Sequence, residues 1–119
     1  NTNSKICWVA GFSFGAWVAM QLLMRRPEIN GFVSVSPPAS SRDFSFLAPC
    51  PSSGLIVHGD KDNIASYDSA KILADKLQKQ KKVNIKFQSI KGADHFYENY
   101  SDEFTSIVDG YINENIDQN

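Results

Sequence analysis

The sequence predicts an α/β fold, with a mainly parallel sheet of about four strands and flanking helices. Three observations support this prediction. Short apolar runs, typical of buried strands, alternate along the chain with longer segments of helical periodicity. Strands that alternate with helices favour crossover connections, and hence parallel strands. Polar segments with reactive side chains follow three of the apolar runs, and in parallel sheets functional residues gather beyond the carboxyl ends of the strands.

The first predicted strand and helix lie on either side of a glycine-containing turn. Residues 5–10 are apolar on both faces, which predicts a fully buried strand that includes Cys7. The helix after the turn is expected to end near Arg26, because Pro27 cannot continue it. A second strand is predicted over residues 31–36, where small and β-branched residues precede two prolines.

An irregular stretch separates the second strand from the third. Residues 37–53 hold four of the five prolines and many serines, so we expect a connecting loop. Within it, Phe44, Phe46 and Leu47 are expected to pack on the body of the protein. Part of the loop could also form a wall over a functional site. The third strand is predicted over residues 54–58.

The second half of the chain is predicted to add a helix, a strand and a helix. The first helix covers residues 66–80, and the last covers residues 101–113. Residues 83–90 alternate between apolar and polar, which predicts a half-buried strand at or near a sheet edge. The apolar faces of the two helices are formed by Ala70, Leu73, Ala74 and Leu77 and by Phe104, Ile107, Val108, Tyr111 and Ile112.

The composition is that of an ordinary globular domain, with 42% hydrophobic and 21% charged residues. A formal net charge of −1 gives no reason to expect a nucleic acid or a membrane surface as partner. No apolar run is long enough to span a bilayer, and no signal peptide is visible. Cys7 and Cys50 are the only cysteines, which suits a reducing compartment as well as a disulfide. We therefore expect a cytoplasmic protein.

The turn after the first strand has the sequence Gly11-Phe12-Ser13-Phe14-Gly15. In a nucleophile elbow, the central serine lies on a strained strand-to-helix turn with its hydroxyl exposed. Gly11 and Gly15 lack side chains, so strand and helix could approach closely. The backbone N–H of Phe14 would point at a developing oxyanion. The same pattern also occurs by chance in α/β proteins, so its interpretation depends on the residues further along the chain.

An acidic turn and a late histidine complete the order Ser13, Asp62, His95. A serine hydroxyl is a weak nucleophile and needs an adjacent base. Histidine suits that role, because its side chain ordinarily titrates at a pKa of about 6.5. A carboxylate on the far nitrogen would fix the tautomer and stabilise the imidazolium. These three residues are far apart in sequence, so only the fold can bring them together.

Other residues of the acidic turn offer alternatives. Asp60 could be the acid, although the first aspartate of such a turn more often caps the backbone. His58 could be the base, but it ends a buried strand, where a satisfied structural histidine is favoured. The spacing of His58, Asp60 and Asp62 matches no standard metal-ligand pattern, so we expect no metal site and no cofactor.

Three motifs in this order resemble the C-terminal half of an α/β-hydrolase of the dienelactone hydrolase-like or small serine esterase type. They are Gly11-Phe12-Ser13-Phe14-Gly15, His58-Gly59-Asp60-Lys61-Asp62 and Gly92-Ala93-Asp94-His95-Phe96. The resemblance covers residues 5–112. It implies a carboxylesterase-like enzyme that cleaves an ester or related acyl bond of a small molecule through an acyl-enzyme. Ser13 would be the nucleophile, Asp62 the triad acid and His95 the general base.

The chain also departs from this family. Its 119 residues would form one domain that is incomplete at the N-terminus, because the second oxyanion donor and further strands would lie upstream of Asn1. The elbow strand would then have an open edge, which invites pairing. We expect a homo-oligomer, or association with the missing N-terminal half. A catalytically idle fragment or subunit, and a binding module without turnover, remain alternative functions.

Overall fold

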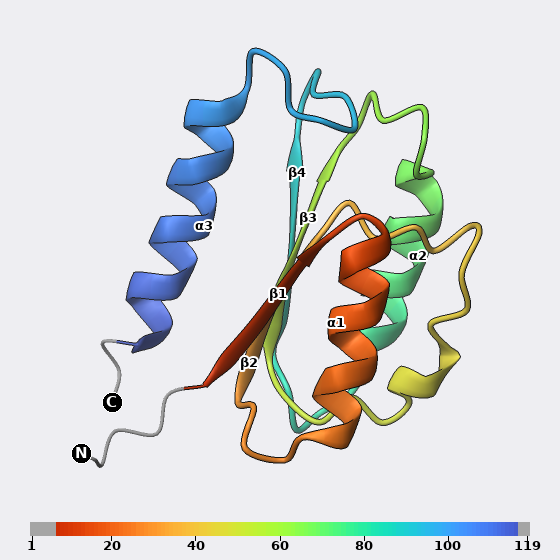
Figure 1. Cartoon of the computed structure of the whole chain (residues 1–119), viewed down its shortest axis with the longest axis vertical. Coiled ribbons are helices and arrows are strands. Elements are labelled where there is room, and N and C mark those ends of the chain that lie inside the picture. The colour runs from red at the N-terminus through yellow and green to blue at the C-terminus, as the bar shows by residue number, and fades with distance from the viewer. Residues whose placement is uncertain (1–6, 117–119) are drawn as a thin grey trace.

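Four parallel strands form one sheet in the order β1-β2-β3-β4 (Figure 1). The computed structural model describes residues 7–116. The strands span Trp8–Phe12 (β1), Gly31–Val35 (β2), Gly54–Gly59 (β3) and Ile85–Ile90 (β4). The predicted α/β fold with a parallel four-stranded sheet is therefore confirmed, as is the position of the last strand at a sheet edge.

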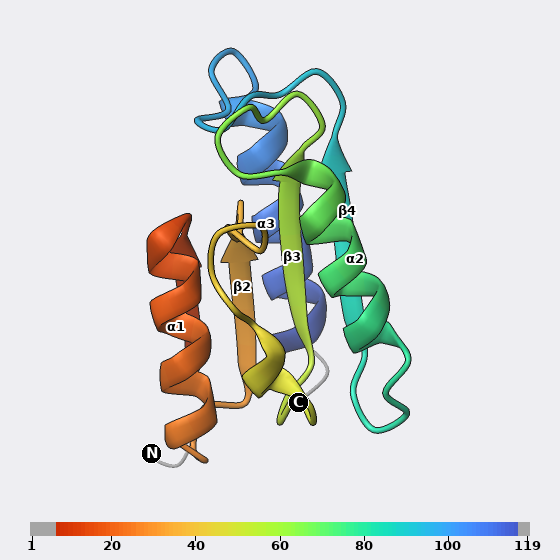
Figure 2. The same ribbon diagram turned by 90° about the vertical axis from the view of Figure 1, so that its right-hand side faces the viewer.

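Helices cover both faces of this sheet. Helices α1 (Phe14–Arg25) and α2 (Tyr67–Gln78) lie on one face, and α3 (Ser101–Ile116) lies on the other (Figures 1 and 2). The connection from β2 to β3 contains a single turn of 3-10 helix, η1 (Ser45–Leu47), on the side of α1 and α2. In the described part of the chain, no helix is long and apolar enough to cross a membrane.

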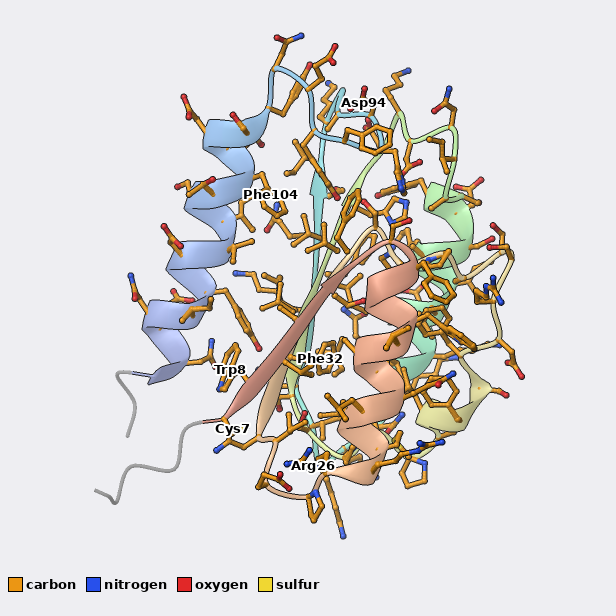
Figure 3. All side chains as sticks on the ribbon, viewed as in Figure 1. Cys7, Trp8, Arg26, Phe32, Asp94 and Phe104 are labelled. Carbon is orange, nitrogen blue, oxygen red and sulfur yellow. The ribbon has the colours of Figure 1, made fainter. Side chains whose placement is uncertain are left out.

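Two hydrophobic clusters fill the space between the sheet and its helices. Successive strand residues point to opposite faces, so β2 sends Phe32 toward α1 and Val33 toward α3. Phe104 lies between α3 and the sheet (Figure 3). Because both faces are covered, β2 and β3 are buried along their whole length, and this explains their apolar composition.

Strand β1 differs from its prediction. It runs from Trp8 to Phe12 rather than over residues 5–10, whose first two positions lie outside the described residues. It is also only partly buried, because in the described part of the chain it lies at an edge of the sheet. Trp8 packs on Tyr111 of α3, whereas Ala10 and Phe12 on the same face are exposed. Cys7 is exposed and precedes the strand, so its predicted burial is wrong.

The irregular stretch after β2 packs as predicted. Phe44 and Leu47 are buried, and Phe46 packs against them and against the cluster under α1 and α2. The boundaries of the later helices shift by a few residues. Ser66 caps α2 by accepting a hydrogen bond from the Ser69 N–H at 3.1 Å, so the helix proper begins one residue later than predicted.

Candidate active site

Ser13, Asp62 and His95 follow β1, β3 and β4 respectively, and they lie at the carboxyl ends of these strands. All four strands are parallel, so these ends meet at one edge of the sheet. In Figures 1 and 2 the loops after β3 and β4 lie side by side at this edge. Asp94, beside His95, marks the same place in Figure 3. The fold thus brings together three segments that are distant in sequence.

Ser13 occupies a strained turn between β1 and α1. Its backbone has φ 58° and ψ −123°, a conformation that a non-glycine residue rarely adopts. The Ser13 N–H donates to the Val35 carbonyl at 2.8 Å, which ties the turn to the end of β2. Its carbonyl accepts from the Ala16 N–H at 2.8 Å and starts α1. These bonds hold the residue in its strained conformation.

The two glycines of the turn have different surroundings. A Cβ on Gly11 would overlap the carbonyl of Gly15 and the backbone of Ala16, so this glycine permits the close approach of β1 and α1. A Cβ on Gly15 would meet no atom of the described residues within 4 Å. A close contact of the kind expected for this turn is thus found at Gly11, and no atom of the described residues restricts a side chain at Gly15.

The Asp62 carboxylate is held by hydrogen bonds to both of its oxygens. Its Oδ1 accepts from the backbone N–H groups of Ile64 at 2.9 Å and Ala65 at 2.8 Å. Its Oδ2 lies 2.8 Å from Nδ1 of His95, and the side chain is fully buried. The backbone of the β3–α2 loop therefore orients the carboxylate toward the imidazole.

His95 links the other two side chains. Its Nδ1 lies 2.8 Å from Asp62 Oδ2, and its Nε2 lies 3.0 Å from Ser13 Oγ. A carboxylate only accepts hydrogen bonds, so Nδ1 carries the proton and the neutral ring can accept the Ser13 hydroxyl proton at Nε2. The ring lies against Phe12 and Phe96, with centroid distances of 5.1 and 5.0 Å. The histidine is buried, and one nitrogen faces the serine hydroxyl.

The β3–α2 and β4–α3 loops are joined directly to each other. A Cβ on Gly59 would overlap the Ala93 carbonyl, and this carbonyl accepts from the Lys61 N–H at 3.0 Å. Asp60 Oδ1 accepts from the Gly92 N–H at 2.7 Å. Asp60 thus receives a backbone hydrogen bond, as predicted, but from the other loop. It bonds to neither His95 nor Ser13, so the geometry favours Asp62 as the partner of the histidine.

Two further buried residues lie beside the site: Tyr97, which no motif singled out, and His58, which the sequence favoured as a structural histidine. Tyr97 has φ 58°, and its hydroxyl lies 2.7 Å from Ser36 Oγ and donates to the Val57 carbonyl at 3.3 Å. Burial raises the pKa of Tyr97 to about 12, so its hydroxyl stays protonated. The second residue is His58, whose Nε2 lies 2.8 Å from the Ala65 carbonyl and 3.3 Å from Asp62 Oδ2. Only proximity in the fold reveals these partners.

Three exposed phenylalanine rings lie next to Ser13 in sequence or against the His95 ring. The exposed fractions of Phe12, Phe14 and Phe96 are 42%, 51% and 65%, which is high for phenylalanine. The Phe14 ring packs on Trp17, and the Arg42 guanidinium lies over both rings at 4.9 and 5.1 Å. We call Phe12, Phe14 and Phe96 the aromatic rim.

A parallel sheet with helices on both faces and a strained serine after one strand are features of the α/β-hydrolase class. The chain belongs to the dienelactone hydrolase family, whose sequence profile matches residues 1–117. The resemblance inferred from the three motifs is therefore confirmed.

Known proteins of similar sequence and structure match most of the chain. The chain is 47% identical over 116 residues to the uncharacterized protein RP471 of Rickettsia prowazekii (strain Madrid E). The aligned region spans 94% of this chain and 49% of that protein. The structure of this chain is similar to that of ATU1826 from Agrobacterium tumefaciens, a protein of unknown function described as a candidate α/β hydrolase. The TM-score is 0.94 at 49% identity, over 98% of this chain and 53% of that one.

A more distant solved structure belongs to the same class. An α/β serine hydrolase homologue from Coxiella burnetii matches at a TM-score of 0.71 and 29% identity, over 84% of this chain and 46% of that one. The chain thus spans about half the length of the relatives it matches.

Proposed function

We propose that the protein is a serine hydrolase that cleaves an ester or related acyl bond of a small molecule through an acyl-enzyme. The observation that best supports this is the pair of hydrogen bonds, 3.0 and 2.8 Å long, from Ser13 to His95 and from His95 to Asp62. Ser13 is the nucleophile, His95 the general base and Asp62 the acid of the triad. Membership of the dienelactone hydrolase family supports the same reaction class.

Acylation begins when Ser13 Oγ attacks the acyl carbon and His95 Nε2 accepts the hydroxyl proton. Asp62 stabilises the imidazolium that forms. The Phe14 N–H belongs to the first residue of α1, where N–H groups have no partner within the helix, so it can donate to the oxyanion. When the tetrahedral intermediate collapses, the bond to the alcohol breaks and the alcohol takes the proton from His95.

Deacylation repeats these steps with water in place of serine. His95 Nε2 takes a proton from the water as its oxygen attacks the acyl carbon of the ester on Ser13. The second tetrahedral intermediate then releases the carboxylic acid, and the proton returns to Ser13 Oγ. The cycle consumes one water and needs no cofactor.

The aromatic rim favours substrates with apolar or aryl groups. Phe12 and Phe96 lie beside the His95 ring, and Phe14 lies on the other side of Ser13 in sequence. An apolar group over these rings would leave water and gain aromatic contacts. Short aryl esters are therefore suitable first substrates.

Steady-state hydrolysis of short aryl esters by the full-length protein tests this function. We expect Ser13→Ala to reduce kcat to the background of the assay, because no other hydroxyl lies against His95 Nε2 in the described structure. Ser106→Ala is the matched control, since Ser106 is exposed on α3. Equal activity of Ser13→Ala and the wild type would reject the assignment.

A second candidate is a catalytically idle subunit or binding module that keeps the geometry without turnover. It is favoured by the fact that the chain spans about half the length of its relatives. Under this candidate, the wild type and Ser13→Ala would show the same background rate, yet both would bind an aryl ester.

A further inference from the structure

We propose that His58 is a positioning residue of the active site, a neutral imidazole whose Nε2–H group holds the Asp62 carboxylate and its loop in place for His95. This inference rests on the proposed function of Ser13, Asp62 and His95. His58 is the last but one residue of β3 and is fully buried. It does not touch the serine, so its effect would pass through Asp62.

The contacts of His58 form a closed ring with Asp62 and Ala65. The Nε2 of His58 lies 2.8 Å from the Ala65 carbonyl, while the N–H of Ala65 donates to Asp62 Oδ1 at 2.8 Å. The same Nε2 lies 3.3 Å from Asp62 Oδ2, the oxygen that faces His95. His58 therefore fixes the peptide that holds one carboxylate oxygen, and it places a polar hydrogen close to the other.

These contacts determine the tautomer of His58. A carbonyl oxygen can only accept a hydrogen bond, so Nε2 carries the proton. The other nitrogen, Nδ1, is buried and has no hydrogen-bond partner among the described residues. A second proton would have to go on Nδ1, where no acceptor compensates for the loss of water. The geometry therefore keeps His58 neutral.

The charged and titratable groups around His58 lead to the same conclusion. Burial is the main reason why the pKa of His58 is lowered, and the nearby His95 also lowers it, whereas the Ala65 hydrogen bond and the Asp62 charge raise it. The Tyr67 ring of α2 lies edge-on at 6.0 Å. Because the folded protein disfavours the cation, the stability that neutral His58 provides is present above its ordinary pKa of 6.5 and is lost as the pH falls through the lowered value.

This arrangement places two imidazoles on one carboxylate oxygen, with different tasks. His95 becomes a cation during the reaction, and the charge of Asp62 stabilises it. If His58 could also become a cation, it would repel the His95 imidazolium and compete for the same oxygen. A neutral donor orients Asp62 without weakening this stabilisation. We therefore expect loss of the donor to reduce kcat rather than substrate binding.

Two substitutions in the full-length protein distinguish the effect of the hydrogen-bond donor on activity from the effect of the imidazole ring. In His58→Gln the side-chain amide can donate near the position of Nε2, whereas His58→Leu has no donor and leaves the Ala65 carbonyl unpaired. We expect His58→Leu to lose about ten- to a hundred-fold in kcat, with KM within about twofold, because polar contacts that orient a charged group are lost. We expect His58→Gln to recover most of this activity. Wild-type kcat in a folded His58→Leu variant would overturn the proposal.

An NMR titration gives a result that does not depend on turnover. With ¹⁵N-labelled histidine in the Ser13→Ala variant, we expect His58 to keep a protonated Nε2 and a bare Nδ1 from about pH 6 to 8, the range in which histidines ordinarily titrate. A proton on Nδ1 in this range would overturn the proposal even if His58→Leu failed to fold. If the wild type shows no hydrolysis while the tautomer is as expected, the proposed function fails and the structural role of His58 does not.

Discussion

The two aspartates of the β3–α2 loop show how position decides the role of a residue. Both are in one turn, yet Asp62 is buried against His95 and Asp60 is exposed and bonded to the Gly92 N–H. Asp62 thus belongs to the hydrogen-bonded chain that includes Ser13. Asp60 joins two loops and contacts no reacting group.

We predict that Asp62→Asn lowers kcat about a thousand-fold or more, while Asp60→Asn acts mainly on stability. An asparagine amide can present a donor to His95 Nδ1 and favour the wrong tautomer, so the base would be lost. Asp60→Asn weakens one exposed hydrogen bond, which costs about 1 kcal/mol. The measurements are steady-state kinetics on an aryl ester and thermal unfolding. Loss of activity in Asp60→Asn with retention in Asp62→Asn would show that the acid is wrongly assigned.

At the residue scale, the sequence could predict those positions that belong to motifs. Ser13, Asp62 and His95 each follow a predicted strand, so their convergence could be inferred before the structure was known. The end of a buried strand also favoured a structural histidine at position 58, but the hydrogen-bond partners of Tyr97 and His58 could not be inferred in this way. Their partners, Ser36 and Asp62 among them, depend on how loops from different strands pack, and no local pattern encodes this.

At the scale of elements, β1 shows the limit of hydrophobic patterns. An apolar run predicts burial, but it cannot tell a central strand from an edge strand. The interior strands β2 and β3 are buried throughout, whereas β1 has only β2 beside it in the described structure. The sequence predicts the turn after β1 better than the burial of β1, because the strand, the turn and the helix are adjacent in sequence. Even there, the sequence suggested equal roles for Gly11 and Gly15.

We predict opposite effects for alanine at these two glycines. Gly11→Ala would force its Cβ into the backbone of α1 and should destabilise the protein by about 1–3 kcal/mol, with loss of activity. Gly15→Ala adds a methyl group in open space within a helix, where alanine is favoured over glycine by about 1 kcal/mol. Thermal unfolding of the full-length variants would test this. Equal destabilisation by both would mean that Gly15 meets a neighbour beyond the described residues.

At the scale of the whole molecule, the open edge of β1 is the most consequential feature. Among the described residues no strand pairs with the side of β1 opposite β2, and the exposed Phe12 lies at the end of this strand. Unpaired strand edges with apolar side chains promote association. We propose that another segment of a longer hydrolase, or a second copy of this chain, covers this edge.

This proposal predicts that residues 1–119 alone are not a self-sufficient monomeric enzyme. The isolated chain should self-associate in light scattering. If the covering segment supplies a second oxyanion donor, aryl ester hydrolysis by the isolated chain should be slow, because loss of one such donor typically costs about a hundred- to a thousand-fold in rate. Adding the segment that covers the edge of β1 should abolish the self-association and raise the rate of hydrolysis. A stable monomer of the isolated chain with the full-length rate would contradict the proposal.

Covalent labelling is the most direct test of whether Ser13 is the nucleophile that carries the acyl group. The full-length protein is treated with a fluorophosphonate, which reacts with activated serines, and the adduct is mapped by intact mass and peptide mass spectrometry. We predict one adduct per chain, on Ser13, and none in Ser13→Ala. Labelling that persists in Ser13→Ala, or an adduct on a different serine of the wild type, would show that Ser13 is not the nucleophile.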